Sequence, residues 1–442
     1  MEKPVPEVVQ RDGLSNIFKN LGWLLGGKGF AAVCSIVYLA VLSRSLGLRD
    51  FGHFSLIFGT GQALVAIASF QTWQTLVRFG ASSVVSHDWA RFGRLAWLCG
   101  ALDVTGAVVG TFIAWIVYYG FGDALDLNPD YINMAFAFNC ALLWSRMTTP
   151  NGIVRVLDRF DIGSYVEAVI PVGRLIASFI ILATGASVGR FLLAWAVLEL
   201  LSAAIYWIVA WRLVPRALHH GNFGHWDRTI EENPGIIRFF GITYGNATLD
   251  ALYKQGPLLA VGYFLGTSAA GLYRLADQIA QSIGKFATLI TRAVFPEFVH
   301  AQMGTDAWSF RKLVRQVTLI AGAGGVLVTL AAIFFGRTLL ELIGGSAFGG
   351  GAEVLVPLAI AASFELASVS YEPTLLATGH ANYPLIVRAI SLAVMLAGIF
   401  LLWSYGPEGI GWAVMIGMVV CYVLMSFAVR LVMRQMTAAS AQ

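Results

Sequence analysis

The sequence has few charged residues and few cysteines. Charged residues make up 12% of the 442 residues, half of the ~25% found in soluble globular proteins. Four cysteines, Cys34, Cys99, Cys140 and Cys421, all fall in apolar segments and lack the spacing of metal ligands. We expect them to pack as small hydrophobic side chains. The composition therefore indicates a membrane protein, without a cysteine-based metal site.

Motifs for nucleotide binding and hydrolysis are also missing. There is no G-x-x-x-x-G-K-[ST] segment, and residues 26–29 (Gly-Gly-Lys-Gly) have neither the spacing nor the hydroxyl of a phosphate-binding loop. No H-E-x-x-H or G-x-S-x-G occurs. His219, His220 and His225 lie close together, and a solvated basic loop is favoured there over a metal site. We therefore predict no catalytic residue, no cofactor, no metal site and no enzyme activity.

Hydrophobic residues are what the sequence has in abundance. They make up 57% of the chain, with a mean hydropathy of +0.72. A helix that crosses a bilayer needs about 20 mostly apolar residues. This length predicts twelve spans, at 21–43, 53–77, 95–119, 132–150, 162–184, 190–213, 239–265, 268–293, 314–336, 354–378, 384–404 and 409–433. The predicted fold class is an all-α polytopic membrane protein.

Lysine and arginine are distributed unevenly between the two sides of the predicted membrane. The side that holds both chain ends carries roughly five times as many of them as the other side, which places both termini in the cytoplasm. Residues 1–20 are charged and lack an early apolar run, so they predict a cytoplasmic amphipathic lead-in, not a signal peptide. The external loops are too short for a folded domain. Net charge is only +4 without a basic tract, so no nucleic acid partner is expected.

A short pattern occurs twice, once after the first predicted span and once after the seventh. Leu46, Gly47, Gly52, Phe54 and Leu56 are matched 219 residues later (46 to 265) by Leu265, Gly266, Gly271, Tyr273 and Leu275. Leu-Gly turns are common between spans, but five matched positions favour a true repeat. The repeat predicts two pseudo-symmetric six-helix lobes around a central cavity, related by an axis along the membrane normal. The lobes are residues 21–214 and 239–434, with a cytoplasmic linker at 215–238 and a tail at 435–442.

Several cations lie inside predicted spans, where an ionised group costs at least ~2.5 kcal/mol. In the eighth span, residues at steps of 3, 1, 3, 4 and 7 from Arg274 to Arg292 form one polar stripe. Two interpretations compete: internal salt bridges (Asp250 with Lys254, Arg274 with Asp277, Glu167 with Arg174), or an anionic substrate. The stripe holds more cations than acids, which favours a phosphate-bearing substrate. The candidate substrate-binding residues are Lys28, Arg174, Lys254, Arg274, Lys285 and Arg292.

Acidic residues in the spans are candidates for coupling transport to an ion gradient. Glu199 and Glu365 have no cation nearby in the sequence. Such a carboxylate could exchange H⁺ or coordinate Na⁺, or it could be a protonated carboxyl that bonds a neighbouring helix. Asp250 and Asp277 complete the set of candidates.

Four segments follow the first predicted helix, end the eighth, enter the tenth and follow the tenth: residues 42–56, 293–296, 342–352 and 379–382. Together they resemble the polysaccharide transport family, the Wzx-type O-antigen and exopolysaccharide flippases of the multidrug/oligosaccharidyl-lipid/polysaccharide exporter superfamily. The family is held together by pattern more than by invariant motifs, so no catalytic motif transfers.

The resemblance implies a bacterial inner-membrane protein that flips an undecaprenyl-pyrophosphate-linked oligosaccharide to the periplasmic leaflet by alternating access. It also implies contacts with membrane lipids and with polysaccharide polymerase and chain-length proteins. H⁺ or Na⁺ are the candidate coupling ions. Two alternatives stay open. One is a cation-coupled multidrug exporter of the same superfamily, which an Arg/Lys stripe disfavours. The other is a membrane polysaccharide polymerase or ligase, which short external loops disfavour.

Overall fold

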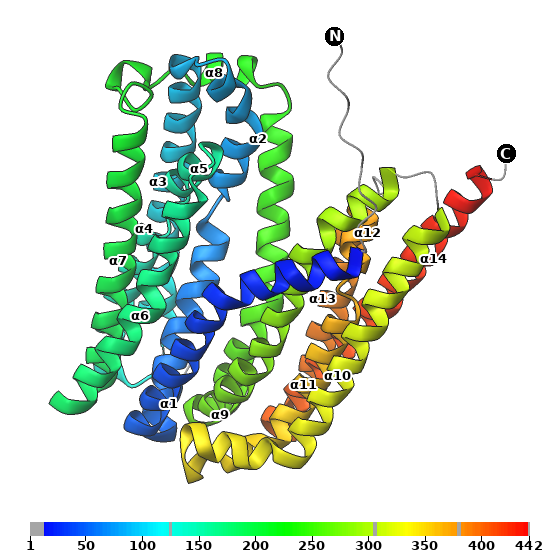
Figure 1. The fold of residues 1–442 in the computed structure, drawn as a ribbon. Coiled ribbons are helices and arrows are strands. Elements are labelled where there is room, and N and C mark those ends of the chain that lie inside the picture. The colour runs from blue at the N-terminus through cyan, green and yellow to red at the C-terminus, as the bar shows by residue number, and fades with distance from the viewer. Residues whose placement is uncertain (1–12, 123–125, 304–306, 378–381, 441–442) are drawn as a thin grey trace.

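The computed structural model describes residues 13–122, 126–303, 307–377 and 382–440 (Figure 1). Side chains are described outside 13–32, 283–314 and 434–440 and a few single positions. Within these ranges the chain is helical with no strand, which confirms the predicted all-α class. The α-helices are α1 Gly13–Ala68, α2 Thr72–Val85, α3 Trp89–Gly120, α4 Pro129–Ser145, α5 Thr149–Val156, α6 Phe160–Thr184, α7 Val188–Leu213, α8 Trp226–Glu232, α9 Ile236–Met303, α10 Ala307–Gly344, α11 Ala352–Ala367, α12 Tyr371–Ala377, α13 Asn382–Leu402 and α14 Gly406–Ser440.

Eight helical stretches in the described residues are long and apolar enough to cross a membrane. Three of them, of 53, 47 and 52 residues, are long enough for two crossings each. The number twelve itself stays a prediction. The first helix begins at Gly13, inside the segment predicted as a lead-in. Charged residues such as Lys19 are good helix formers, so a helix can continue beyond the apolar run that marks its span.

Two glycines give both halves of the chain the same kink. Gly47 in α1 has φ 72° and ψ 179°, and Gly266 in α9 has φ 83° and ψ 179°. Glycine reaches positive φ readily, because it lacks the Cβ atom that makes this region costly for other residues. The repeated Leu-Gly pattern therefore marks one backbone conformation, which occurs at equivalent places in α1 and α9.

The two copies of this pattern pack directly against each other. A Cβ atom placed on Gly52 would lie 1.9 Å from the Thr267 carbonyl oxygen, and one on Gly271 would lie 2.6 Å from the Leu48 carbonyl oxygen. Leu48 and Thr267 occupy equivalent repeat positions, so the contact is self-complementary, as in an isologous dimer interface. We call this contact, formed by residues 47–52 and 266–271, the glycine seam.

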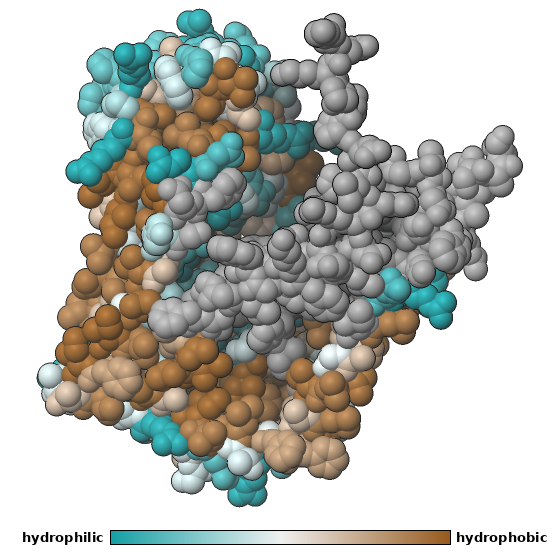
Figure 2. All heavy atoms as spheres, in the orientation of Figure 1, coloured by the Kyte–Doolittle hydropathy of each residue, from teal (hydrophilic) through white to brown (hydrophobic). Residues whose placement is uncertain are grey.

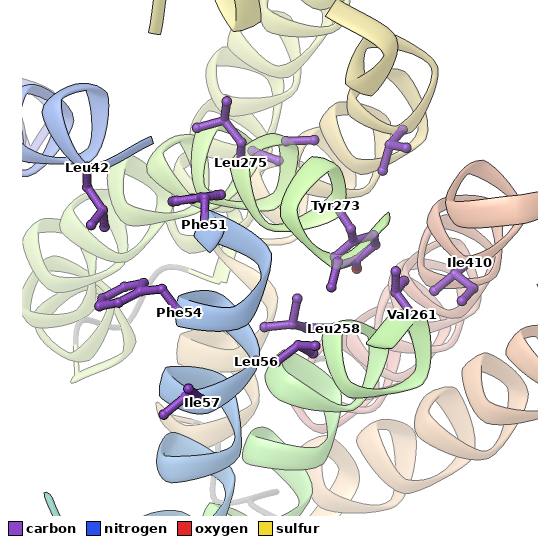
Figure 3. Close-up of a cluster of buried hydrophobic side chains, with 14 of the residues drawn as sticks. Leu42, Phe51, Phe54, Leu56, Ile57, Leu258, Val261, Tyr273, Leu275 and Ile410 are labelled. Atoms are coloured by element: carbon purple, nitrogen blue, oxygen red, sulfur yellow. The ribbon is translucent and has the colours of Figure 1, made fainter. Parts of the chain in front are cut away.

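The largest apolar cluster of the described residues includes side chains of both lobes and lies around this seam. Figure 3 shows α1 side chains, including Phe51 and Leu56, packed beside α9 side chains, including Leu258 and Leu275. Further from the seam, one cluster around Leu76 and Phe92 contains residues of α2, α3, α5, α7, the connection after α7 and the start of α9. Separate clusters bury the rest of each lobe. The lobes therefore share a core at one end and have their own cores at the other.

This arrangement gives the molecule two helical groups that meet at one end. Figure 1 shows α2–α7 in one group and α10–α14 in the other, with α1 and α9 joining them at the end opposite the two termini. We call that end the closed end. On the coloured part of the face drawn in Figure 2, hydrophobic residues cover the middle and hydrophilic residues gather towards the two ends. This surface is the one expected of a multi-pass membrane protein.

The second and fourth predicted spans are each interrupted, contrary to the continuous helices expected at 53–77 and 132–150. The break between α1 and α2 contains Gln71 with φ 52°, and α5 restarts at Thr149 after α4 has ended at Ser145. Asp103 of α3 accepts hydrogen bonds from the Thr72 hydroxyl at 2.9 Å and from the Thr149 N–H at 2.8 Å. This buried carboxylate therefore satisfies polar groups that the two breaks leave free.

We expect Asp103→Ala to destabilise the N-terminal lobe. Asp103 is 6% exposed, and its loss leaves the Thr149 N–H without its acceptor, which costs about 1–3 kcal/mol. The thermal unfolding midpoint in detergent should fall, whereas Thr105→Ala, an exposed change two residues away, should leave it unchanged. An unchanged midpoint in Asp103→Ala would show that the restarted helices do not depend on this carboxylate.

Candidate functional site

A buried ion-pair triad lies in the N-terminal lobe. Arg174 of α6 donates from Nη2 to Glu199 Oε1 at 2.9 Å, and Arg146, just after α4, donates to the same oxygen at 3.0 Å. Glu199 is 3% exposed and Arg174 is 8% exposed. Arg174 Nε has no hydrogen-bond partner in the described part of the chain. One carboxylate thus faces two guanidinium groups.

Aromatic rings surround the Arg174 guanidinium and connect it with the other lobe. Its Cζ lies 5.2 Å from the Trp195 ring centroid and 5.4 Å from that of Phe58. Arg274, from α9, places its Cζ 5.9 Å from the same Phe58 ring. Cation–π contacts of this kind help to hold a guanidinium in a site from which water is excluded. Phe58 therefore lies against one arginine from each lobe.

Arg274 belongs to a polar chain along α9. Its Nη1 lies 3.5 Å from Asp277 Oδ2, a distance too long for a strong charge-assisted hydrogen bond. Gln281 donates to the same carboxylate oxygen at 2.7 Å. In the amide orientation that its neighbours require, Gln278 accepts from Arg274 Nη2 at 2.6 Å. The first half of the predicted stripe is thus one connected network.

Among the described ion pairs where the lobes meet, positive charge exceeds negative charge. Three guanidinium groups, from Arg146, Arg174 and Arg274, are matched by two carboxylates, Glu199 and Asp277. Arg146 is 40% exposed by side chain, so an anion could approach it. A guanidinium fork can hold a phosphate through two parallel hydrogen bonds. The junction can therefore bind an anionic group.

A cavity of about 580 Å³ opens beside this junction, lined by residues of the C-terminal lobe. Asp277 lies at its wall, so the cavity and the α9 network touch. Its charged lining consists of four acids and two bases: Asp250, Asp277, Glu365, Glu372, Lys254 and Arg388. The lining described here is thus acidic, although the sequence led us to expect a cationic cavity. The acids come from several helices, α9, α11 and α12, whose faces the sequence could not orient.

Two ion pairs account for most of the charges in the cavity. Lys254 Nζ lies 2.8 Å from Asp250 Oδ2, the i,i+4 pair that the sequence suggested. Arg388 of α13 lies 2.8 Å from Glu372 of α12. Glu365 forms no ion pair within the described residues. Among the described residues, no cluster of three or more His, Cys, Asp and Glu side chains is arranged to hold a metal ion.

The third suggested pair, Glu167 with Arg174, is wrong. Glu167 lies 3.4 Å from Arg155, while Arg174 binds Glu199. Seven residues along a helix separate two side chains by about 10 Å, so partners on neighbouring helices are closer. Glu199 has two cations close by in space, Arg146 and Arg174, although it has none nearby in sequence. Its role as a coupling residue stays a prediction.

The remaining candidate cations fall where side chains are not described. Lys28, Lys285 and Arg292 lie on α1 and α9, and their side chains lie outside the described residues. Their proposed role as substrate-binding residues stays a prediction. Arg174, Arg274 and Lys254 are placed by the structure, the first two at the junction and the third at the cavity.

Several residues of the site had no signal in the sequence. Phe58, Trp195 and Tyr38 look like ordinary apolar positions in their spans, yet their rings surround Arg174. Arg146 and Arg388 each lie near the end of a predicted span, where a cation is typical of a loop that flanks the membrane. Only the packing of distant helices brings these residues together.

At the closed end, polar contacts join the lobes on both sides of the glycine seam. Asp126, in the α3–α4 loop, accepts from the Thr267 N–H at 3.1 Å and from its hydroxyl at 3.0 Å. Arg44 donates to the Leu342 carbonyl oxygen at 2.6 Å. Loops and helix ends of the two lobes thus contact each other here, and these contacts close this end of the molecule.

The contact made by Asp126 should depend on pH. The Thr267 N–H, hydrogen-bonded to this carboxylate, holds the pKa of Asp126 below its usual value, about 3.9. A lowered pKa means that the contact is fully present above pH ~4 and is lost as pH falls through the lower folded-state value. The distance between spin labels at Asp130 and Ser346 should be constant from pH 7 to about 4, and the distribution of that distance should broaden at lower pH. Asp126→Asn should weaken the contact at neutral pH; a wild-type distance in that variant would contradict this role.

Comparison with solved structures defines the class of fold. The chain is similar to an inward-facing multidrug resistance MATE family transporter of the MOP superfamily (TM-score 0.78, 13% identity, covering 92% of this chain and 96% of that one). It is also similar to the lipid II flippase MurJ in an inward closed conformation (TM-score 0.67, 11% identity, 94% and 90%). The protein has the two-lobe fold of MOP-superfamily transporters.

The sequence identifies the family. Residues 17–302 match the model of the polysaccharide biosynthesis protein family, and the chain belongs to this family. The inner membrane protein YghQ of Escherichia coli is 26% identical over 74% of this chain and 92% of the relative. The capsular polysaccharide biosynthesis protein CapF of Staphylococcus aureus is 22% identical over 87% and 91%. The resemblance to polysaccharide transport proteins is thereby confirmed.

Proposed function

We propose that this protein flips an undecaprenyl-pyrophosphate-linked oligosaccharide from the cytoplasmic to the periplasmic leaflet of a bacterial inner membrane. The family and the transporter fold support this function. A structural neighbour is named as a lipid II flippase, and a relative is named for capsular polysaccharide biosynthesis. In this proposal both termini are cytoplasmic, the closed end is periplasmic, and the product serves O-antigen, exopolysaccharide or capsule synthesis.

The observation that carries the proposal is the excess of guanidinium groups where the lobes meet. Arg174 and Arg274 come from different lobes and lie against one Phe58 ring. A pyrophosphate held between them would contact both lobes at once, so its binding could favour one relative position of the lobes over another. Lys285 and Arg292, further along α9, would extend the cationic path. Lys28 would do so from α1.

Ion coupling is part of the proposal and is assigned to the C-terminal lobe. Glu365 lines the cavity without an ion pair in the described part of the lining, and Asp250 and Asp277 line the same cavity. A carboxylate without a paired cation can exchange H⁺ or bind Na⁺ while the cavity alternates between the two sides. The neighbouring acids would change the affinity of such a site.

The acidic lining also favours a second candidate, a cation-coupled multidrug exporter. Four acids against two bases would suit a cationic drug, and a structural neighbour is named as a multidrug resistance transporter. Cells that overproduce the protein would then survive higher concentrations of cationic dyes. The flippase predicts no such resistance, because its substrate is an anion.

A flipping assay tests the proposal. The purified protein is placed in vesicles that contain a short undecaprenyl-pyrophosphate-linked oligosaccharide, and a membrane-impermeant glycosidase or lectin reports the outer-leaflet fraction over time. The flippase should expose the inner-leaflet glycan well above the rate of protein-free vesicles. Equal rates with and without the protein, under H⁺ and Na⁺ gradients of both directions, would refute the proposal.

A further inference from the structure

Two ion pairs in the wall of the C-terminal cavity are open to a ligand. The side chains of Lys254 and Asp250 are 56% and 45% exposed, and those of Arg388 and Glu372 are 40% and 43% exposed. All four residues line the cavity. Each cation is already matched by its own carboxylate, so neither pair has net charge to offer a phosphate. What the pairs do offer is hydrogen-bond donors and acceptors within reach of a neutral ligand.

The Arg388–Glu372 pair presents donors and acceptors side by side. Arg388 of α13 donates from Nη2 to Glu372 Oε2 of α12 at 2.8 Å. A guanidinium group has five N–H donors and a carboxylate has about four acceptor sites, so one hydrogen bond uses a small part of either capacity. A hydroxyl group can both donate and accept. Two neighbouring hydroxyls of a sugar can therefore bond to the guanidinium and to the carboxylate at once.

Tyrosine rings supply the apolar part of the same wall. Tyr253, Tyr273 and Tyr371 line the cavity, and the buried Tyr253 hydroxyl has no hydrogen-bond partner in the described part of the chain. The face of an aromatic ring is electron-rich, so the C–H face of a sugar can lie against it. The cavity volume of about 580 Å³ lies within the ~300–1,000 Å³ of sites for small organic ligands. Size and lining together suit a short oligosaccharide.

The charge that remains after pairing is negative. Lys254 and Arg388 are matched by Asp250 and Glu372, whereas Glu365 forms no ion pair within the described residues. A ligand that carries its own carboxylate would meet like charge in this cavity, where the interaction is screened less than in water. The described lining therefore disfavours acidic sugars and accepts uncharged ones.

The cavity begins where the guanidinium junction ends. Asp277 lines the cavity, and its Oδ2 lies 3.5 Å from Arg274 Nη1. A pyrophosphate held at Arg274 would thus have its first sugars beside the cavity wall, since the glycan is joined directly to the pyrophosphate. The anionic and the uncharged parts of one ligand would then lie in adjoining places of opposite charge.

We propose that this cavity receives the glycan of the lipid-linked substrate, and that it selects glycans whose lipid-proximal sugars are uncharged over those that carry a carboxylate. The inference rests on the proposed function and adds the chemical class of the glycan to it. In this proposal the Arg388–Glu372 pair binds sugar hydroxyls, and the unpaired charge of Glu365 disfavours acidic sugars.

Binding of two probes that differ in one group tests this inference. Both are undecaprenyl-pyrophosphate-linked disaccharides, and the outer sugar is glucose in one and glucuronic acid in the other. The full-length protein in nanodiscs is titrated with each probe, and native mass spectrometry gives the apparent Kd. The glucose probe should bind at least about tenfold more tightly, because the carboxylate of the other probe meets like charge. Equal binding, or tighter binding of the glucuronate probe, would overturn the inference.

Glu372→Gln should shift the preference towards the acidic glycan. It removes the carboxylate that Arg388 pairs with, so the guanidinium group can hold a ligand carboxylate through two parallel hydrogen bonds. The glucuronate probe should gain about tenfold in affinity, and the glucose probe should gain nothing. A variant that was merely misfolded would lose affinity for both probes. A ratio of the two Kd values equal to that of the wild type would contradict the role of this pair.

The matched control is Glu341→Gln. Glu341 Oε1 lies 2.9 Å from Arg337 Nε in an i,i+4 pair on α10, and neither residue belongs to the described lining of the cavity. The same substitution thus frees an arginine elsewhere on the protein, and both probes should bind as they do to the wild type. An equal shift in Glu341→Gln would mean that any added positive charge attracts the acidic probe, which would refute the assignment to the cavity.

Flipping of the same two probes separates this inference from the proposed function. A wild-type protein that flips both probes equally well, with no change in Glu372→Gln, refutes the selection of uncharged glycans and leaves the flippase standing. A wild-type protein that binds the glucose probe selectively but flips neither probe refutes the proposed function and not the glycan class.

Discussion

Replacing Arg174 or Arg274 with glutamine should reduce flipping of the lipid-linked oligosaccharide by about 10- to 100-fold, because each loses a charge-assisted hydrogen bond to the pyrophosphate. Both guanidinium groups are buried beside Phe58, where water does not replace them. Glutamine keeps most of the volume and removes the charge. The initial rate of glycan exposure in vesicles measures the effect, normalised to the amount of folded protein.

A structural role for Arg174 predicts a different pattern, and a double variant distinguishes the two. Arg174→Gln alone leaves Glu199 with Arg146 as its only ion-pair partner among the described residues, and breaking a buried ion pair often costs 3–5 kcal/mol. Arg174→Gln combined with Glu199→Gln returns the triad of Arg146, Arg174 and Glu199 to its wild-type net charge. This double variant should fold as well as the wild type and still fail to flip.

The matched control is Arg155→Gln. Arg155 Nη2 lies 3.4 Å from Glu167 Oε1, and the Glu167 side chain is 55% exposed. Surface ion pairs contribute about 0–1 kcal/mol, so this variant should flip normally. Should the double variant at positions 174 and 199 flip normally too, Arg174 serves the stability of the lobe and not the substrate.

Gly52→Ala and Gly271→Ala should each prevent the closed end from forming. The added methyl group would lie 1.9 Å from the Thr267 carbonyl oxygen in the first variant and 2.6 Å from the Leu48 carbonyl oxygen in the second. Both neighbours are backbone atoms of the other lobe, so relief requires the lobes to separate. Alanine is otherwise favoured over glycine in a helix by about 1 kcal/mol, so propensity alone predicts the opposite sign.

Distance measurements between spin labels at Asp130 and Ser346, one on each lobe and both exposed, report the separation. The distance should lengthen in both variants, and flipping should fall at least about tenfold. Gly256→Ala on α9 is the control, because its Cβ atom meets nothing within 4 Å; its distance and flipping rate should be those of the wild type. Closed-end distances that stay unchanged in Gly52→Ala and Gly271→Ala would show that the seam does not hold the lobes together.

The glycine seam shows which part of the fold could be predicted from the sequence and which could not. The Leu-Gly repeat at positions 46 and 265 identified two related halves, because only glycine adopts the φ of 72° and 83° found at Gly47 and Gly266 without strain. That the two copies touch each other was not predictable. The pattern gives a local backbone conformation and contains no information on which distant segment packs against it.

The candidate site was also predictable only in part from the sequence. The pair Asp250–Lys254 could be predicted, because residues four apart on a helix are neighbours. The triad of Arg146, Arg174 and Glu199 could not, because its members come from the residue after α4, from α6 and from α7. The helix break at residues 146–148 was not predictable either, because apolar composition does not reveal that one helix ends and the next begins with its N–H bonded to a buried carboxylate.

The sequence by itself determined that this is an all-helical membrane protein with a repeated half and with charges inside its spans. Hydropathy, charge distribution and glycine positions are properties of the chain, and burial in lipid imposes them directly. Only the tertiary structure decided which charges are paired, that arginines of both lobes share the Phe58 ring, and that the described lining of the cavity is acidic. Those facts depend on how helices distant in sequence face one another, and a helix can rotate to present another face without any change in its hydropathy.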